Sequence, residues 1–234
     1  MNTDTTATGR ILHPSYLGLR DYQATVAAMR HFTETRDEAT PDQVWLLQHP
    51  SVYTLGLNGN PDHLLEPSTI PLVRTDRGGQ ITWHGPGQLI VYPLLDLRRN
   101  RLGVRELVGA LEQSVLGLLR QYGIHGETRP DAPGVYVAGR KIASLGLRIR
   151  RGCSYHGLSL NVNNDLTPFA ATHPCGYPGL EVISLATLGI ETCPEQVAAA
   201  LLRQLLMAIK PPFRSPVGSP GTRSLPMARA RRTC

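Results

Sequence analysis

The segment Arg77–Pro93 reads RGGQITWHGPGQLIVYP and combines two glycine clusters, an arginine and a histidine with an apolar run. Glycine lets backbone N–H groups approach a ligand closely, and successive N–H groups can form a nest that binds an anion. The spacing matches neither the Walker loop nor the dinucleotide-binding fingerprint. The segment therefore predicts a ligand site of another kind. A simpler interpretation, a β-hairpin whose glycines serve only its turns, stays open.

Apolar patterns on both sides of this segment predict an α+β fold. Helices are expected at residues 21–36, at 103–122 and, after the capping-box spacing of Thr192 and Glu195, up to residue 209. Strands are expected at 11–12, 43–48, 52–56, 71–75, 89–95, around 135, and at 142–149 and 156–162. The strict βαβ alternation of a doubly wound fold is absent. The stripe that defines the second helix consists of Val104, Leu107, Val108, Leu111, Val115, Leu118 and Leu119.

Residues 1–210 are expected to form a single domain, followed by a disordered tail at 211–234 that is rich in Pro, Gly, Ser and Arg. The tail holds five of the 24 basic residues and no acidic one, which leaves 19 basic against 18 acidic residues in the remainder. The net charge of +6 therefore does not indicate the basic folded surface that nucleic-acid binding requires. No apolar run is long enough to span a membrane, and Met1–Arg10 lacks the apolar stretch of a signal peptide. We expect a cytoplasmic protein whose four cysteines are not paired in disulfides.

Lysine is rare in this chain: of 24 basic residues only Lys141 and Lys210 are lysines. Lys210 follows a helical run, and a helix C-terminus favours any cation. Lys141 lies instead in the glycine-punctuated apolar segment AGRKIASLG, residues 138–146. Lysine can lose its proton when it is buried, whereas arginine effectively cannot. Lys141 is therefore a candidate base or proton shuttle, unless it reaches solvent from a strand end.

A second candidate is Cys175, in the Pro- and Gly-rich segment THPCGYPG of residues 172–179. A reactive cysteine needs partial exposure and a nearby positive charge. Lys141 would supply that charge if the fold brought the two residues together. A free loop thiol is the alternative interpretation. A zinc site is another, because Cys153-x-x-His156 and His173-x-Cys175 supply zinc-ligand types, although at spacings shorter than the usual finger pattern.

Four motifs together resemble the lipoyl(octanoyl) transferase family, the octanoyl-[acyl-carrier-protein]:protein N-octanoyltransferases. They occupy residues 77–88, 139–144 (GRKIAS), 151–163 (RGxSxHGL…NVN) and 174–176 (PCG), in the family's order and with family-like spacing. The resemblance spans roughly residues 11–209. It implies a biotin/lipoate protein ligase-like fold, with a central mixed β-sheet and flanking helices.

The resemblance also implies a Cys-Lys dyad, in which Cys175 accepts the acyl group and Lys141 is its partner. The implied donor is octanoyl-acyl carrier protein. The implied acceptors are lysine amines on lipoyl domains of 2-oxoacid dehydrogenases and on the glycine cleavage H protein. No cofactor, metal, nucleic acid or membrane is implied. The residues implied to line the acyl site are Arg77, Gly78, Gly79, Gln80, Ile81, Thr82, Trp83, His84, Ser144, Leu145, Gly146, Gly157, Leu158 and Ser159.

Two other classes of protein are weighed against this one. An ATP-dependent lipoate or biotin ligase shares the fold but forms an acyl-adenylate, and it needs no nucleophilic cysteine. A non-catalytic module that binds carrier proteins would need neither member of the dyad. Because Arg140, Arg148, Arg150 and Arg151 are close to Lys141 in sequence, we expect the acidic carrier to dock beside Lys141.

Overall fold

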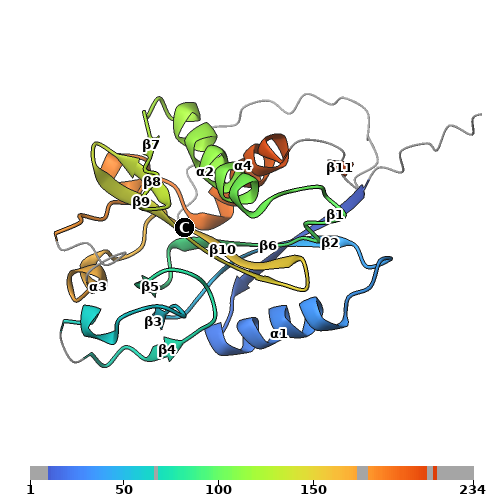
Figure 1. Cartoon of the computed structure of the whole chain (residues 1–234). Helices are drawn as coiled ribbons and strands as arrows, with labels where there is room; N and C mark the ends of the chain where they lie inside the picture. The colour runs from blue at the N-terminus through green and yellow to red at the C-terminus, as the bar shows by residue number, and fades with distance from the viewer. Residues whose placement is uncertain (1–9, 66–67, 173–178, 210–212, 215–234) are drawn as a thin grey trace, which may run out of the picture.

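The computed structural model describes residues 10–65, 68–172, 179–209 and 213–214, and its centre is an eight-stranded sheet (Figure 1). β1 pairs in parallel with β2 and β11, and the other neighbours are antiparallel. The expected mixed sheet is therefore confirmed. In order across the sheet, the strands are β11 (Phe213–Arg214), β1 (Arg10–Leu19), β2 (Asp42–Gln48), β6 (Gln88–Leu94), β10 (Cys153–Asn161), β9 (Arg140–Arg150), β8 (Gly134–Val137) and β7 (Glu127–Thr128).

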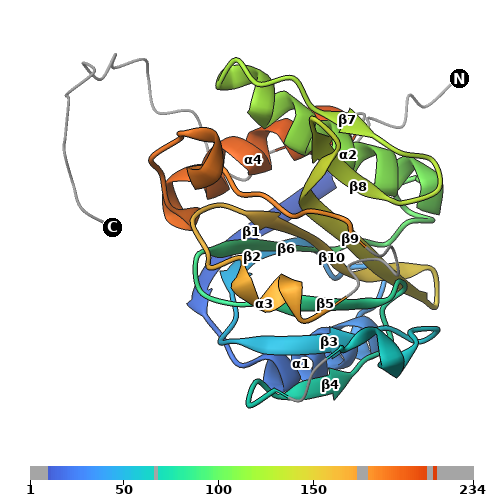
Figure 2. The same cartoon turned by 90° about the vertical axis from the view of Figure 1, so that its left-hand side faces the viewer.

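A second, three-stranded sheet has the order β4 (Leu72–Arg74), β3 (Val52–Leu55), β5 (Ile81–His84). It lies beside α1 (Tyr22–Thr35) on one side of the large sheet, as Figures 1 and 2 show. The opposite side is covered by α2 (Val104–Gln121) and α4 (Pro194–Ala208). Three short elements complete the described chain: η1 (Pro61–His63), α3 (Thr167–Ala170) and η3 (Ala186–Leu188).

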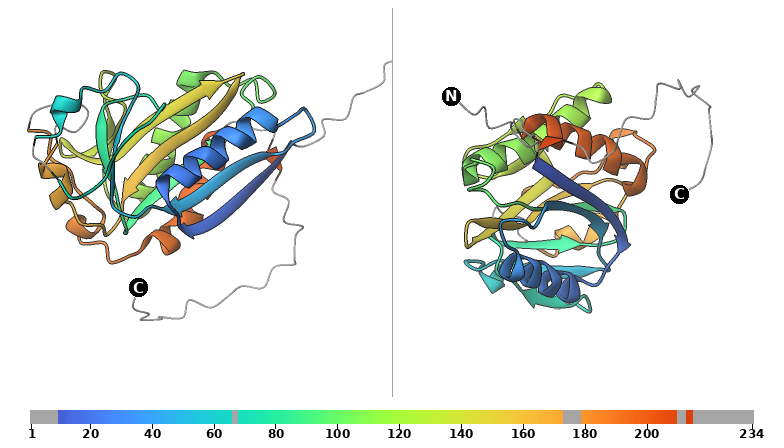
Figure 3. Two further views of the ribbon diagram at one scale, coloured as in Figure 1. Left: turned by 90° about the horizontal axis from the view of Figure 1, so that it is seen from below. Right: turned by 90° about the vertical axis from the view of Figure 1, so that its right-hand side faces the viewer.

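Helix α1 begins at Asp21, whose carboxylate accepts a hydrogen bond from the N–H of Ala24 at 2.8 Å. Its buried residues recur at helical spacing, so one face of the helix is apolar. That face lies across the large sheet, as seen from below in Figure 3. The helix predicted at residues 21–36 is confirmed, and its buried residues include Tyr22, Val26, Met29 and Thr33.

The larger core lies between the sheet and the pair α2 and α4. Val104, expected to belong to the apolar stripe of α2, is instead 46% exposed. It is the first residue of the helix and stands outside the cluster that the later turns form with α4. The stripe is buried as predicted at Leu107, Leu111, Val115, Leu118 and Leu119, whereas Val108 is only half-buried.

Helix α4 begins at Pro194, with Cys193 as the N-cap residue and no side-chain cap. The predicted capping box at Thr192 is therefore wrong by one residue, and the Thr192 hydroxyl contacts Gln196 instead. Proline at the first helical position explains the start, since its fixed φ suits the helix and it has no N–H to satisfy.

Strands β9 and β10 form a long hairpin, whose turn places Arg151 at φ 53° and Gly152 at φ 81°. Arg140 and Arg148 lie at opposite ends of β9, about 26 Å apart at 3.3 Å per residue. Arg150, near the turn, forms an ion pair with Glu34 of α1 at 3.0 Å. Extended strand geometry therefore carries all of these arginines but Arg140 away from Lys141, so as a group they do not support the expected docking of the acidic carrier beside Lys141.

The tail also differs in part from expectation. Phe213 and Arg214 form β11 and pair with Arg10 and Ile11 of β1, whereas Lys210 and residues 215–234 lie outside the described residues. The sequence did not predict β5, β7 or α3, which are four residues or fewer in length. In the part of the chain that is described, no helix has the length and apolar character needed to cross a membrane.

A buried ionic cluster surrounds Asp42 at the start of β2, where the carboxylate is 1% exposed. Its Oδ1 accepts hydrogen bonds from Arg36 at 2.5 Å, from Arg99 at 2.6 Å and from the N–H of Asp96 at 2.9 Å. Its Oδ2 accepts one from Asn100 at 2.6 Å. The cluster joins the end of α1 and the loop after β6 to the large sheet.

We expect Asp42→Asn to lower the free energy of unfolding by about 3–5 kcal/mol, because it leaves a buried guanidinium without its counter-ion. Urea denaturation measures this loss. Glu34→Gln is the matched control: it removes the half-exposed pair with Arg150 and should change stability by less than about 1 kcal/mol. Equal losses in the two variants would contradict a stabilising role for the buried cluster.

Candidate active site

A narrow pocket runs between β5 of the small sheet and the β9–β10 hairpin of the large one. Its walls come from two motifs far apart in the sequence, the segment 77–84 and the hairpin. Of the residues that the resemblance implied for the acyl site, all line this pocket except Gly78 and Trp83. Tyr22, Tyr92 and His156 line it as well. The fold thus brings 12 of the 14 predicted residues together in one pocket (14 − 2).

Two facing glycines let the backbones around this pocket approach closely. Gly146 of β9 and Gly157 of β10 are opposite one another in the hairpin register. A Cβ on Gly146 would lie 2.8 Å from the carbonyl oxygen of Gly78, and one on Gly157 would lie 2.2 Å from that of Val91. Any side chain at either position would push the strands or the loop apart. Both glycines are therefore required by the packing of the pocket wall.

Gly78 and Trp83 have structural contacts instead of positions on the pocket. The N–H of Gly78 donates to the carbonyl oxygen of Leu147 at 2.9 Å and joins the loop to β9. The indole N–H of Trp83 donates to Ser51 at 2.8 Å, and its ring packs against Phe169 on the other side of the small sheet. Successive strand residues point to opposite faces, which is why Trp83 and its neighbours Thr82 and His84 diverge.

Arg77 lines the pocket, but its buried guanidinium donates hydrogen bonds to Thr54 of β3 and to the loop itself. It donates to the carbonyl and hydroxyl oxygens of Thr54 at 2.6 and 2.7 Å. It also donates to the carbonyl oxygens of Gly78 at 2.9 Å and Gln80 at 3.0 Å. Arg77 therefore fastens the glycine-rich loop to β3.

The anion-binding nest predicted from the sequence is wrong at Gly78 and Gly87, because the N–H groups of both residues already have partners in the protein. The N–H of Gly78 is bonded to Leu147, and the N–H of Gly87 donates to the side chain of Gln48 at 2.7 Å. Gly79 and Gly87 have φ values of 89° and 84°, so they serve the turns of the loop, as the simpler interpretation held.

His84 forms part of the pocket wall with Tyr22 and Tyr92, and His49 contacts Tyr92 from outside the lining. His84 stacks on Tyr22, and its Nδ1 lies 2.7 Å from Oε1 of Gln88. Nε2 of His49 lies 2.9 Å from the hydroxyl of Tyr92. Burial lowers the pKa of His84 to about 3 and that of His49 to about 4. Both rings are therefore neutral near pH 7 and act as hydrogen-bonding groups without charge.

The sequence offered unequal signals for the three additional lining residues. Tyr22 and Tyr92 stand at apolar positions of a helix and a strand, and nothing in those patterns marks them as members of a site. His156 precedes Gly157 inside one of the four motifs, so its place in the motif was a usable signal. Its backbone, with φ at 57°, could not be read from the sequence.

Lys141 is among the largest fully buried side chains and is only 1% exposed. Its Nζ donates to the carbonyl oxygen of Pro133 at 3.0 Å and to the hydroxyl of Tyr136 at 3.1 Å. The same amine lies 5.1 Å from the centroid of the Tyr136 ring. The alternative of a lysine that reaches solvent from a strand end is therefore wrong.

Gly134 makes room for this lysine. A Cβ at position 134 would lie 2.7 Å from Cε and 2.9 Å from Nζ of Lys141, and 2.6 Å from the carbonyl oxygen of Ala143. The φ of Gly134 is 146°, a value that side-chain-bearing residues rarely adopt. The absence of a side chain at 134 is thus a condition for the position of the buried amine.

Cys175 and His173 lie outside the described residues, but the chain that follows them is paired with Lys141. The N–H of Lys141 donates to the carbonyl oxygen of Glu181 at 2.8 Å, and the N–H of Ile183 donates to the carbonyl oxygen of Lys141 at 2.9 Å. Glu181 is six residues after Cys175, a span of at most about 20 Å. The backbone of Lys141 therefore anchors the segment that leads away from the cysteine.

Cys153 and His156, the second pair considered for a zinc site, are each bonded elsewhere and do not form a pair of metal ligands. Cys153 is buried with its Sγ near the carbonyl oxygen of Arg151, whereas Nε2 of His156 is bonded to Asp76. Across the described ranges, no group of three or more His, Cys, Asp or Glu residues is arranged to hold a metal ion.

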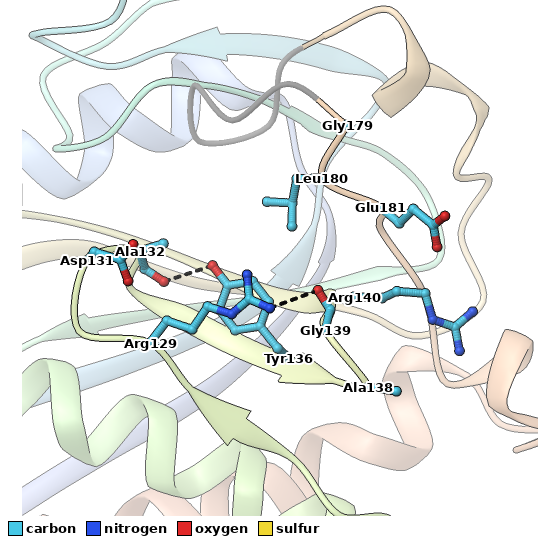
Figure 4. Close-up of a pocket in the computed structure, with 10 residues that line it drawn as sticks. All are labelled: Arg129, Asp131, Ala132, Tyr136, Ala138, Gly139, Arg140, Gly179, Leu180 and Glu181. Carbon is cyan, nitrogen blue, oxygen red and sulfur yellow. Dashed lines mark hydrogen bonds between the residues drawn. The ribbon is translucent and has the colours of Figure 1, made fainter.

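A hollow of about 450 Å³ opens beside Tyr136, the aromatic partner of Lys141 (Figure 4). The guanidinium of Arg129 lies over the Tyr136 ring at 4.3 Å and donates to the carbonyl oxygen of Gly139 at 3.2 Å. The Tyr136 hydroxyl donates to the carbonyl oxygen of Ala132 at 2.8 Å. Leu180 faces this pair from the other side of the hollow. An open approach thus reaches the residues that position Lys141.

Solved structures of low sequence identity share this fold. A putative lipoate protein ligase from T. acidophilum matches with a TM-score of 0.68 at 16% identity, covering 88% of each chain. A biotin protein ligase from Aquifex aeolicus matches with a TM-score of 0.53 at 13% identity, covering 84% of this chain and 70% of that one. The biotin/lipoate protein ligase-like fold is confirmed.

Sequence comparison is more specific. The model of the lipoyl protein ligase A/B catalytic domain matches residues 21–206. Octanoyltransferase from Alkalilimnicola ehrlichii is 60% identical over 83% of this chain and 90% of its own length. Octanoyltransferase from Halorhodospira halophila is 59% identical over 85% and 91%. The chain belongs to the lipoyl protein ligase A/B catalytic-domain family and, within it, to the octanoyltransferases, which are acyltransferases.

Proposed function

We propose that this protein takes an octanoyl group from the thioester of octanoyl-acyl carrier protein and transfers it, through a thioester on Cys175, to a lysine amine of a lipoyl domain. The observation that carries the proposal is Lys141: a buried amine, held by two oxygen acceptors, whose backbone is bonded to the segment that follows Cys175. The narrow pocket along β9 and β10 takes the octanoyl chain.

In the first step the Cys175 thiolate attacks the thioester carbonyl carbon. The C–S bond to the carrier breaks, and the carrier leaves as a thiol once it gains a proton. Thioester exchange changes the bonding little, so no ATP is required. In the second step the acceptor lysine amine attacks the acyl-enzyme, an amide forms, and Cys175 leaves as a thiolate. Both steps pass through an oxyanion that backbone N–H groups can stabilise.

Lys141 has the protonation chemistry that both steps need. As an ammonium close to Cys175 it favours the thiolate, whose nucleophilicity depends on nearby positive charge. As a neutral amine it accepts the proton that the acceptor lysine loses on attack. Its two oxygen acceptors, Pro133 and Tyr136, keep the amine in one place through both states. A residue that must both lose and carry a proton is one that arginine cannot replace.

The high identity to octanoyltransferases favours this reaction over the ATP-dependent ligase, which has the same fold but does not require a nucleophilic cysteine. The solved structures that share the fold include a bipartite lipoate protein ligase from Thermoplasma acidophilum, studied with its E2 lipoyl domain. This relative supports a lipoyl domain as the class of acceptor. We extend the proposal to lipoyl domains of 2-oxoacid dehydrogenases and the glycine cleavage H protein. We also infer that residues 1–210 act as a single catalytic domain in the cytoplasm.

We expect mixing with octanoyl-acyl carrier protein, without acceptor or ATP, to give an octanoyl adduct that intact-mass analysis detects. Hydroxylamine should release it, since it is a thioester, and Cys175→Ala should not form it. Cys234→Ala is the matched control and should retain the adduct. An adduct that appears only with ATP would support the ligase, and none under any condition would support a binding module.

We expect Lys141→Arg and Lys141→Met each to reduce kcat for transfer to a lipoyl domain by at least about 100-fold, the scale of general acid–base catalysis. The arginine variant keeps the charge and the methionine variant keeps an unbranched apolar chain, but both lose the amine that exchanges protons. Single-turnover transfer from preformed acyl-enzyme measures the second step directly. If Lys141→Arg transferred at the wild-type rate, Lys141 would act only through its charge.

We expect Gly134→Ala to reduce transfer, because the added methyl group overlaps the Lys141 side chain and displaces its amine. The reduction should exceed about tenfold in kcat, with a smaller change in KM. Gly123→Ala is the control, since it also has a positive φ of 71° but open space around it. A circular-dichroism melt separates a displaced amine from a lost fold. A soluble, folded Gly134→Ala enzyme with unchanged kcat would contradict this role.

A further inference from the structure

Two amide side chains, those of Gln88 and Asn161, are buried side by side behind the pocket wall. Gln88 ends the glycine-rich motif and begins β6, and Asn161 is the last residue of β10. The two residues are opposite one another in the antiparallel register of these strands. Gln88 is 1% exposed and Asn161 is 4% exposed. Because a buried amide is unfavourable unless its donors and acceptors have partners, a buried pair in the sheet calls for an explanation.

A backbone carbonyl determines the orientation of both amides. Nδ2 of Asn161 donates to the carbonyl oxygen of Ile183 at 3.0 Å, and that oxygen can only accept. Oδ1 of Asn161 therefore faces Gln88, whose Nε2 donates to it at 2.9 Å and also lies 3.4 Å from the carbonyl oxygen of Trp83. Oε1 of Gln88 is then an acceptor, so Nδ1 of His84, 2.7 Å away, carries the hydrogen. The hydrogen bonds form one directed chain, from His84 to Ile183.

Ile183 connects this chain to the backbone of Lys141. The N–H of Ile183 donates to the carbonyl oxygen of Lys141 at 2.9 Å, and the N–H of Lys141 donates to the carbonyl oxygen of Glu181 at 2.8 Å. Val182, between them, pairs in parallel with Lys141. Both polar groups of the Ile183 backbone are thus bonded, the N–H to β9 and the carbonyl oxygen to Asn161.

The backbone of Asn161 holds the residues that follow Ile183. Its carbonyl oxygen accepts a hydrogen bond from the N–H of Leu185 at 3.1 Å. His84, at the other end of the chain of hydrogen bonds, lines the pocket. Asn161 is therefore the point at which the pocket wall, the strand of Lys141 and the segment that follows Cys175 are joined.

We propose that Asn161 is a positioning residue for acyl transfer, and that Gln88 orients its amide. Neither residue lines the pocket. Their side chains keep the backbone of Lys141, and through Ile183 the segment that follows Cys175, in a fixed position relative to His84. The inference rests on the proposed function, in which Lys141 and Cys175 act together. The position matters because a shift of about 1 Å in a catalytic group lowers the rate by about 100-fold.

The test is Asn161→Asp, which keeps the shape of the side chain but replaces the donor to Ile183 with a carboxylate oxygen. We expect kcat for octanoyl transfer to a lipoyl domain to fall about 10- to 100-fold, with KM for octanoyl-acyl carrier protein within about twofold of the wild-type value. Asn161→Ala, which introduces no charge, should show the same division between kcat and KM and serves if the aspartate variant does not fold. Hydrogen–deuterium exchange at the N–H of Ile183 should be faster in both variants.

Ser154→Ala is the matched control for a loss of stability alone. The buried hydroxyl of Ser154 donates to the carbonyl oxygen of Pro93 at 2.7 Å, at the opposite end of β10 from Asn161. Its loss should lower Tm by an amount similar to that of Asn161→Ala, yet keep kcat within about twofold of the wild-type value.

Gln88→Met tests the orienting role, since it keeps the length of the side chain and removes the amide. It should lower kcat as Asn161→Ala does. Combined with Asn161→Ala it should lower kcat little further, because two residues in one chain of hydrogen bonds are not independent.

Each outcome bears on one proposal. A folded Asn161→Asp or Asn161→Ala enzyme with the wild-type kcat overturns the role of Asn161, and so does an equal fall of kcat in Ser154→Ala. Losses that add in the double variant overturn the coupling to Gln88. A wild-type enzyme that transfers no acyl group from the carrier overturns the proposed function instead. In that case, unchanged exchange at Ile183 in the Asn161 variants would still overturn the claim that Asn161 holds this segment.

Discussion

The width of the pocket between β5 and the β9–β10 hairpin depends on how one loop is fastened to two sheets. The guanidinium of Arg77 binds the loop to Thr54 of the small sheet, and the N–H of Gly78 binds it to Leu147 of the large one. Because the loop is fixed at both sides, β5 stays at a set distance from the hairpin. The facing glycines Gly146 and Gly157 then leave a gap that side chains would otherwise fill. An arginine in a glycine-rich motif suggests a cation that binds a ligand. The guanidinium of Arg77 instead donates hydrogen bonds to oxygens of the protein, mostly backbone carbonyls. Arginine suits this structural role because its side chain keeps its proton.

Much of the fold could be predicted from the sequence, because the long elements have clear periodicity. α1, α2, β2, β6 and most of β9 and β10 lie where apolar spacing placed them. The errors have local causes. Val104 fits the stripe of α2 but stands before the core begins, and Thr192 has capping chemistry but precedes a proline that starts the helix one residue later. The elements that were missed are short, and short elements are formed by tertiary contacts more than by propensity.

The pocket was predictable to a different degree. Motif resemblance gave most of its walls, since glycines and serines in fixed order mark a backbone that must approach a ligand. Tyr22 and His156 enter it for reasons that a linear pattern does not contain. Tyr22 comes from the start of α1, far in sequence from the motifs that form the other walls, and His156 reaches the pocket through a left-handed backbone. The arginines of the hairpin show the opposite error: they are close in sequence to Lys141, but an extended strand separates neighbours in sequence faster than any other structure.

The contact between Gly134 and Lys141 also bears on which changes this chain can accumulate. Elsewhere in the chain every basic residue except Lys210 is an arginine. The Lys141 side chain leaves no room for a methyl group at position 134, because an added Cβ would lie 2.7 Å from Cε and 2.9 Å from Nζ. The identity of residue 134 is therefore tied to the position of the Lys141 amine. Position 134 is restricted to glycine both by these contacts and by a backbone conformation, with φ at 146°, that only glycine adopts readily.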